Sequence, residues 1–195
     1  MNRLSNEQRT AVVNCLIEGC SIRSTVRLTG VAKKTVMRLL VECGEFCAQY
    51  QDRAFRNLKC QRIQVDEMWS FCYCKQKNVT SDIAEDRVAG DGADVLHFRI
   101  AESYYLLRTS YVERHNLSVR MTVRRFTRLT NAFSKKIENH CAAVALGYFA
   151  YNFIKINRTL RVTPAMAAGV TTRLWDVCDL VAAWGAYEQE QKRAA

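Results

Sequence analysis

The stretch that decides the fold of the N-terminal region is SIRSTVRLTGVAKKTVMR, which runs from Ser21 to Arg38. Apolar residues at helical spacing predict a short helix over about Ser21 to Leu28 and a further helix over about Lys33 to Glu42. Gly30 lies between them and suits a tight turn, because glycine adopts a positive φ that other residues resist. The stretch therefore predicts two helices joined by a short glycine turn.

Another helix is predicted before this stretch, over Leu4 to Glu18, with Ser5 as its N-cap and Gly19 at its end. Helix, short helix, glycine turn and helix is the order of a helix-turn-helix DNA reader, whose last helix enters the major groove by its N-terminal part. The alternative is a three-helix bundle with a solvated basic face. The side chains predicted to contact DNA in this region are Arg23, Arg27, Lys33, Lys34, Thr35 and Arg38.

The overall composition favours a nucleic-acid partner. The 195 residues include 29 Lys and Arg against 19 Asp and Glu, which gives a formal net charge of +10 and points to a polyanion such as nucleic acid or an acidic membrane surface. The hydrophobic content of 49% and the single proline exclude a disordered chain. No apolar run reaches the ~18 residues that span a bilayer, and we do not expect the N-terminal residues, with Glu7 and no apolar run, to act as a signal peptide. We expect a cytoplasmic, nucleoid-associated protein with no membrane contact.

Cysteine usage agrees with that compartment. The chain has nine cysteines, an odd number, and many of them lie in apolar stretches where a reduced thiol acts as a small hydrophobe. The spacings C-x3-C, from Cys43 to Cys47, and C-x-C, from Cys72 to Cys74, do not form the paired knuckles of a structural zinc site. We therefore expect no zinc, and a zinc-stabilised regulator is the weaker alternative.

Charge is uneven along the chain. Residues 1–60 have a net charge of +5, residues 61–107 of −3 and residues 108–195 of +8. This distribution predicts two DNA-contacting regions around a segment whose carboxylates have a function, or, alternatively, around an exposed acidic loop. Residues 78–94, which are rich in Asp and Glu and lack periodicity, are predicted to be a loop.

One aspartate stands out in the middle segment. Residues alternate between apolar and polar from Ile63 to Tyr73, with one interruption at Glu67, which predicts a half-buried strand with Asp66 on its more polar face. An aspartate opposes the strand propensity of its β-branched and aromatic neighbours, and such local conflicts mark functional or strained positions. The alternative is a solvated carboxylate on an edge strand.

A basic stretch follows between Arg108 and Lys136, with eight Lys and Arg and a single acid, Glu113. The residues from Glu102 to Arg128 favour helix. Glu113 is either a neutralising surface charge or a metal-binding carboxylate beside a path for DNA phosphates. The arginines predicted to contact those phosphates are Arg114, Arg120, Arg124, Arg125 and Arg128.

The C-terminal part of the chain is predicted to be helical. Thr163 and Pro164 form a helix start and Gly169 a stop, and a last helix is expected over Trp175 to Glu188. A helical stripe upstream of them is predicted to face the core; its members are Phe133, Ile137, Cys141, Val144, Tyr148 and Phe149.

Five stretches carry longer motifs: IQVDEMWSF (63–71), KQKNV (75–79), SYVERHNL (110–117), RRFTRLTNAFSKK (124–136) and LRVTPAMAAG (160–169). They resemble the insertion-sequence transposases of the IS1 family, over about residues 4–79 and 109–182. The resemblance implies a DDE-type enzyme with a ribonuclease-H-like core, in which two aspartates and a glutamate hold two Mg²⁺ or Mn²⁺ ions for phosphoryl transfer. Asp66 matches the first aspartate and Glu113 the glutamate, as catalytic and metal-binding residues.

The chain departs from that family in the interval between these two carboxylates. Only 46 residues separate Asp66 from Glu113, too few for the missing strands, their crossover helix and the second aspartate. We therefore expect a mainly α chain with a small β element: a helix-turn-helix over residues 1–58, then a truncated ribonuclease-H-like α/β core with C-terminal helices over residues 59–195.

Two functions follow from that prediction. The first is DNA transposition by an internally deleted enzyme with impaired catalysis. The second is a non-enzymatic DNA-binding protein or inhibitor derived from a transposase. The expected partners are double-stranded DNA of the element ends and either another copy of the chain or a full-length transposase.

Overall fold

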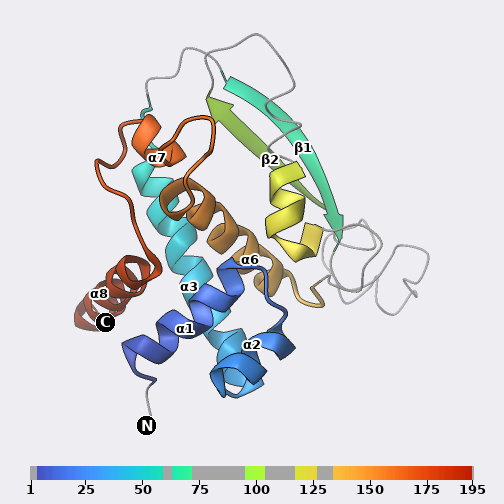
Figure 1. Cartoon of the computed structure of the whole chain (residues 1–195), viewed down its shortest axis with the longest axis vertical. Coiled ribbons are helices and arrows are strands. Elements are labelled where there is room, and N and C mark those ends of the chain that lie inside the picture. Colours follow the sequence, from blue (N-terminus) through green and yellow to red (C-terminus); the bar gives the residue numbers. More distant parts are fainter. Residues whose placement is uncertain (1–3, 59–62, 72–94, 104–116, 127–133, 195) are drawn as a thin grey trace. The chain divides into compact units, whose positions relative to one another are not determined.

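The computed structural model describes residues 4–58, 63–71, 95–103, 117–126 and 134–194. The described chain is mainly helical, as the sequence predicts. It divides into two compact units, which are treated separately below (Figure 1). The first unit comprises Met1–Leu58 and Cys141–Ala195, and the second comprises Lys59–His140.

Helices build the first unit. The N-terminal ones are α1 (Asn6–Ile17), α2 (Ile22–Thr29) and α3 (Lys33–Ala54). The C-terminal ones are α6 (Ile137–Phe149), which begins in the second unit, the π-helix η3 (Ala150–Ile154), α7 (Pro164–Ala167) and α8 (Val177–Ala194).

Local sequence signals set most of the helix ends, as predicted. The Ser5 hydroxyl accepts a hydrogen bond from the Gln8 backbone N–H, and the Gln8 side-chain oxygen accepts one from the Ser5 N–H, which completes a capping box for α1. Gly19 and Gly30 take positive φ values of 74° and 70° after α1 and α2. Thr163 caps α7, in which Pro164 is the first residue.

Helix α3 is longer than predicted: it continues past Glu42 to Ala54. Its buried positions keep the helical spacing past Glu42, through Cys43 and Phe46 to Cys47. Gly44 does not end the helix but lets α6 approach it, since a Cβ there would lie only 2.5 Å from the Ala142 Cα. Close packing against a distant part of the chain therefore extends α3 beyond its local signals.

Aromatic rings fill the core around the C-terminal half of α3. The Tyr50 ring lies 5.3 Å from that of Trp175 and 5.5 Å from that of Phe153, and the rings of Phe149 and Phe153 stack at 4.7 Å. Such contacts contribute about 0.5–1.5 kcal/mol per pair beyond the burial of their area. The C-terminal helices are thus part of the same core as α3.

Helix α8 is also tied to α1. The Arg9 guanidinium lies 3.1 Å from the Glu188 carboxylate and 4.4 Å from the centre of the Trp184 ring, which is almost fully buried. The predicted region over residues 59–195 places residues 141–195 with the middle segment. The structure instead groups them with residues 1–58, because the aromatic core and this ion pair join the two ends of the chain.

The predicted core stripe on α6 is partly wrong. Val144 and Phe149 are buried, but Ile137 and Cys141 are exposed. The helix instead turns its smaller side chains inward, because α3 lies so close at Gly44. The buried positions that replace the predicted ones are Ala142, Leu146, Ala150 and Phe153.

The second unit contains the two strands. β1 (Ile63–Phe71) covers most of the alternating stretch and pairs antiparallel with β2 (Val95–Ser103), with Asp66 opposite Ile100. β2 lies just after the predicted loop and overlaps the start of the predicted helix over 102–128. Of that stretch, the described part is helical at residues 117–122 and in the 3-10 turn η2 (Arg124–Phe126). The regular alternation of Leu96, Phe98 and Ile100 is the strand signal that was missed.

Candidate nucleic-acid interface

The junction between α2 and α3 is held by hydrogen bonds from threonines. The Thr25 side chain is fully buried and its hydroxyl donates to the Ser21 carbonyl at 3.1 Å. The Thr29 hydroxyl donates to the Thr25 carbonyl at 2.7 Å and accepts from the Val31 N–H at 3.3 Å. With Val31 buried and Gly30 left-handed, the turn is fixed by internal contacts. The two helices therefore present their outer faces in a set arrangement.

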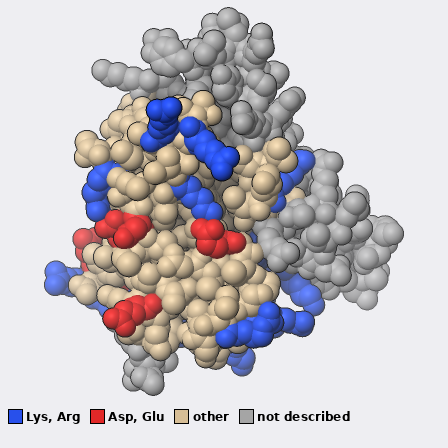
Figure 2. All heavy atoms as spheres, viewed as in Figure 1, with Lys and Arg blue, Asp and Glu red and all other residues tan. Residues whose placement is uncertain are grey.

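Basic side chains occupy those outer faces. Figure 2 shows Lys and Arg gathered at the end of the first unit that carries α2. The exposed ones on α2 and the start of α3 are Arg23, Arg27, Lys33, Lys34 and Arg38, and Thr35 beside them is half-buried. All six predicted contact residues of this region thus belong to one continuous part of the chain.

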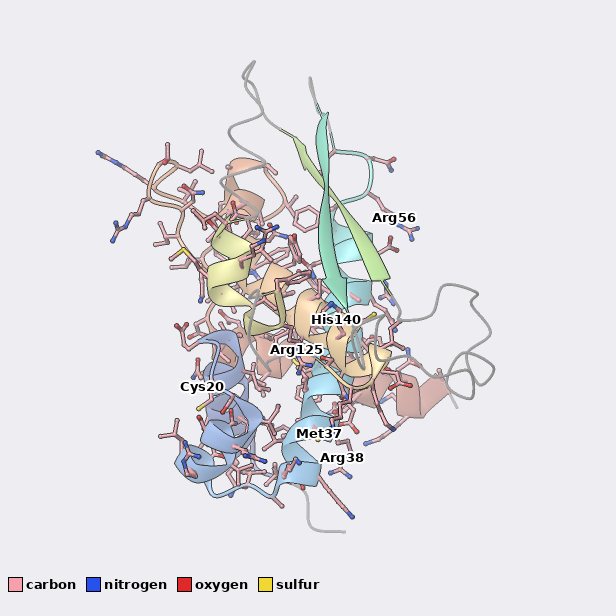
Figure 3. All side chains as sticks on the ribbon, turned by 90° about the vertical axis from the view of Figure 1, so that its right-hand side faces the viewer. Cys20, Met37, Arg38, Arg56, Arg125 and His140 are labelled. Atoms are coloured by element: carbon pink, nitrogen blue, oxygen red, sulfur yellow. The ribbon has the colours of Figure 1, made fainter. Side chains whose placement is uncertain are left out.

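Few acids offset this charge. Neither α2 nor the first two turns of α3 contain an Asp or Glu, and the first acid is Glu42. Its carboxylate lies 3.7 Å from the Arg38 Nε in an exposed i,i+4 pair, which is worth little in water. Arg27 donates a hydrogen bond to the Ser24 hydroxyl at 3.3 Å. Arg38 projects from the N-terminal end of α3 (Figure 3), so this end of the helix carries a strong positive potential.

The start of α3 adds to that potential. Its N-cap is Ala32, with no side-chain hydrogen bond, whereas serine or threonine side chains cap α1, α2 and α7. The first N–H groups of a helix have no partner within the helix, and the helix dipole places partial positive charge on them. An uncapped start among lysines is suited to bind an anion such as phosphate. This feature was not predicted, although the alanine before the first lysine of α3 can be read directly from the sequence.

Two of the predicted basic residues of the second unit have described side chains, and both are less accessible than those of α2 and α3. Arg120 and Arg125 are half-buried. Burial of the His140 imidazole, together with the nearby positive charge of Arg125, lowers the pKa of His140 to about 4. The ring of His140 lies 5.4 Å from that of Phe126, in an edge contact. Figure 3 shows Arg125 and His140 beside each other. Arg125 therefore contributes to the interior of this unit.

The remaining predicted site residues lie wholly or partly outside the part of the chain that the structure describes. Glu113, Arg114 and Arg128 lie outside the described residues, as do the side chains of Asp66 and Arg124. Only the backbone of Asp66 is placed, in the middle of β1. The described part of the chain thus does not assemble the carboxylates that a Mg²⁺ or Mn²⁺ pair would need, and it holds no group of three or more His, Cys, Asp or Glu side chains that could bind a metal.

The cysteines at Cys43 and Cys47 are core residues. Both side chains are fully buried on α3. Burial raises the pKa of the Cys47 thiol well above its usual value, and contact with the Cys43 thiol raises it further. A buried thiol of this kind stays protonated and packs as a small apolar group. Cys60, Cys72 and Cys74 lie outside the described residues.

No helix within the described ranges is long and apolar enough to cross a membrane. Comparison of the chain with protein-family models, with curated proteins and with solved structures finds no match.

Proposed function

We propose that this chain binds double-stranded DNA, with α2 and α3 as a helix-turn-helix and the N-terminal end of α3 in the major groove. The observation that carries the proposal is the cluster of five exposed cations around the uncapped start of α3. In this arrangement phosphate oxygens accept hydrogen bonds from the first N–H groups of α3 and from Lys33 and Lys34. Arg38, one turn further along, is positioned for a base edge or the opposite strand.

The same surface is poorly suited to a membrane. A helix that lies in a bilayer interface has a broad apolar face beside its cations. On α2 and α3, both fully described, Leu28 is the exposed large apolar side chain, and the others are buried or half-buried. The cations also project from two helices joined by a fixed turn. This arrangement favours duplex DNA, which has grooves, over the flat surface of an acidic membrane.

The test is DNA binding as a function of salt. Each phosphate contact adds about 0.9 to the slope of log K against log salt concentration. We expect Lys33→Ala combined with Arg38→Ala to weaken binding and to lower that slope by up to about 1.8. Lys192→Ala combined with Arg193→Ala is the matched control, because it removes the same charge from exposed positions in the last turn of α8. An unchanged slope in the first variant, or an equal loss in the control, would contradict the proposal.

A second candidate function is metal-dependent transfer of DNA strands, with insertion-element ends as substrate and Asp66 and Glu113 as ligands of Mg²⁺ or Mn²⁺. It is supported by the resemblance to IS1-family transposases and by the position of Asp66 in the middle of a paired strand. Nicking or joining of end-containing DNA that needs Mg²⁺ and disappears in Asp66→Ala would support it. Absence of that reaction with either metal would leave a DNA-binding protein that occupies element ends without cutting them.

A further inference from the structure

A second basic surface lies on the connection between η3 and α8. Residues 155–175 contain four Lys and Arg and no Asp or Glu. Two of the four have acidic partners outside this segment: the Lys155 Nζ lies 3.4 Å from the Glu18 carboxylate, and the Arg173 Nη1 lies 2.9 Å from the Asp179 carboxylate. The other two, Arg158 and Arg161, are exposed and form no ion pair or side-chain hydrogen bond with any described residue.

These two arginines are held on a closed turn, residues 157–162. The Asn157 side-chain oxygen accepts hydrogen bonds from the backbone N–H of Thr159, at 3.0 Å, and of Leu160, at 3.4 Å. The Asn157 N–H donates to the Val162 carbonyl at 3.0 Å, and the Arg161 N–H donates to the Asn157 carbonyl at 2.7 Å. The turn is thus closed by its own backbone, and its arginines project from a fixed base.

The backbone of Arg161 is unusual. Its φ of 58° lies in the left-handed region, which favours glycine or asparagine and costs free energy for a residue with a long side chain. Within the described structure the Arg161 side chain contributes no hydrogen bond or ion pair that offsets this cost. A strained residue whose side chain does nothing for the fold indicates a role outside the protein.

The turn lies at the opposite end of α3 from the lysines. The aromatic residues that flank the segment pack on the C-terminal part of α3: Trp175 lies 5.3 Å from Tyr50 and Phe153 lies 5.5 Å from Phe55, measured between ring centres. Figure 1 shows α2 near the N-terminal end of α3 and α7 near its C-terminal end. A helix of 22 residues is about 33 Å long, close to the ~34–36 Å of one turn of B-DNA.

We infer that the turn 157–162 is a second phosphate-binding surface, in which Arg158 and Arg161 contact the DNA backbone about one helical turn away from the start of α3. Guanidinium groups suit this task because they bind two phosphate oxygens at once. The inference rests on the proposed function for the kind of nucleic acid and for the position of the first contact. It adds a part of the protein that lies outside α2 and α3.

The test uses the full chain with Arg158→Gln and Arg161→Gly together. Glycine accepts the positive φ, so the turn keeps its conformation while the guanidinium is lost, and thermal unfolding checks that the fold is unchanged. On a duplex of about 30 base pairs we expect the salt slope to fall by about 1.8 and the footprint to shorten at one side. On a duplex of about 10 base pairs, one helical turn, we expect almost no change.

The control is again Lys192→Ala with Arg193→Ala, which removes the same charge. Equal slopes in the wild type and the arginine variant, an equal loss in the control, or a loss seen only with phosphatidylserine vesicles would overturn the inference. The variant Lys33→Ala with Arg38→Ala separates it from the proposed function. If that variant binds like the wild type while the arginine variant is weakened, α3 is not the first contact and the turn still binds phosphate.

Discussion

The N-terminal end of α3 begins on an alanine and carries exposed lysines, whereas its C-terminal half is enclosed by aromatic rings and by α6. The first end leaves the N–H groups of α3 without a side-chain cap and its lysines exposed, and the second leaves almost no space. The same helix thus has one end without a stabilising cap and one half that is tightly packed. Unsatisfied polar groups at a helix end are typical of a binding site, and close packing is typical of the core that positions it.

A substitution in the tightly packed half of α3 is expected to have the largest effect on stability. A Cβ at Gly44 would lie 2.5 Å from the Ala142 Cα, and a backbone atom cannot move aside as a flexible side chain can. We expect Gly44→Val to lower the free energy of unfolding by about 3 kcal/mol, because α3 and α6 must separate. Denaturant unfolding measures this change.

Gly185 on α8 is the matched control for that prediction. It is also a helical glycine, but a Cβ there would meet nothing within 4 Å. Gly185→Ala should raise the free energy of unfolding by up to about 1 kcal/mol, since alanine favours the helix. If Gly44→Val is as stable as the wild type, the close approach of α6 to α3 is wrong.

The buried His140 in the first turn of α6 is expected to make stability depend on pH. The pKa of His140 falls to about 4 in the folded protein, from an ordinary 6.5, because burial disfavours the charged ring and Arg125 repels it. The unfolded chain therefore takes up this proton first as the pH falls. The stability associated with a neutral His140 is full above pH 6.5 and is lost progressively between pH 6.5 and about 4.

The variant His140→Phe isolates the contribution of the neutral His140 to the free energy of unfolding. In His140→Phe, which keeps a ring beside Phe126, we expect the free energy of unfolding to fall less steeply over the same pH window. Denaturant unfolding of both proteins across that window measures the difference, since their carboxylates are the same. Parallel pH profiles would show that His140 does not titrate as described.

The two ends of α3 also show what the sequence could reveal. The predictions of Ser5, Gly30 and Thr163 as helix boundaries were confirmed, because each depends on neighbours only a few residues away. The end of α3 was placed twelve residues too early, at Glu42, because its continuation depends on Gly44 meeting Ala142 far along the chain. The inward face of α6 was mistaken for the same reason. Local periodicity does not reveal contacts between segments that are distant in the sequence.

In the candidate site, too, the features set by nearby residues could be predicted and the others could not. The exposure of Lys33, Lys34 and Arg38 was predicted from local charge and spacing and is present in the structure. Ala32 is visible in the sequence, but the lack of a side-chain cap on α3 was not among the predictions. The role of Arg161 depends on a left-handed backbone that no propensity of arginine would indicate. Catalysis by Asp66 and Glu113 stays a prediction, because their side chains lie outside the described residues.

The smallest effect is expected from a substitution at the N-terminal end of α3. It is predicted by comparing the N-cap of α3 with that of α2. Ala32 has φ −58° and ψ 141°, close to the −65° and 154° of Ser21, which caps α2 through its hydroxyl. A serine at position 32 therefore has the backbone geometry to cap α3. We expect Ala32→Ser to raise the free energy of unfolding by about 1 kcal/mol. If a DNA phosphate binds the same N–H groups, it must displace the serine hydroxyl from them. DNA affinity should then fall by about fivefold, which corresponds to the free energy of about 1 kcal/mol that the cap contributes.

Ser21→Ala is the reverse experiment on the neighbouring helix. It should lower the free energy of unfolding by about 1 kcal/mol, because the Ser24 N–H loses its 3.1 Å partner. At a temperature where both proteins are fully folded, its DNA affinity should equal that of the wild type. Stability and affinity thus change in opposite directions at position 32, and only stability changes at position 21. If Ala32→Ser stabilises the fold and leaves DNA affinity unchanged, the start of α3 does not hold a phosphate, and the basic side chains alone account for binding.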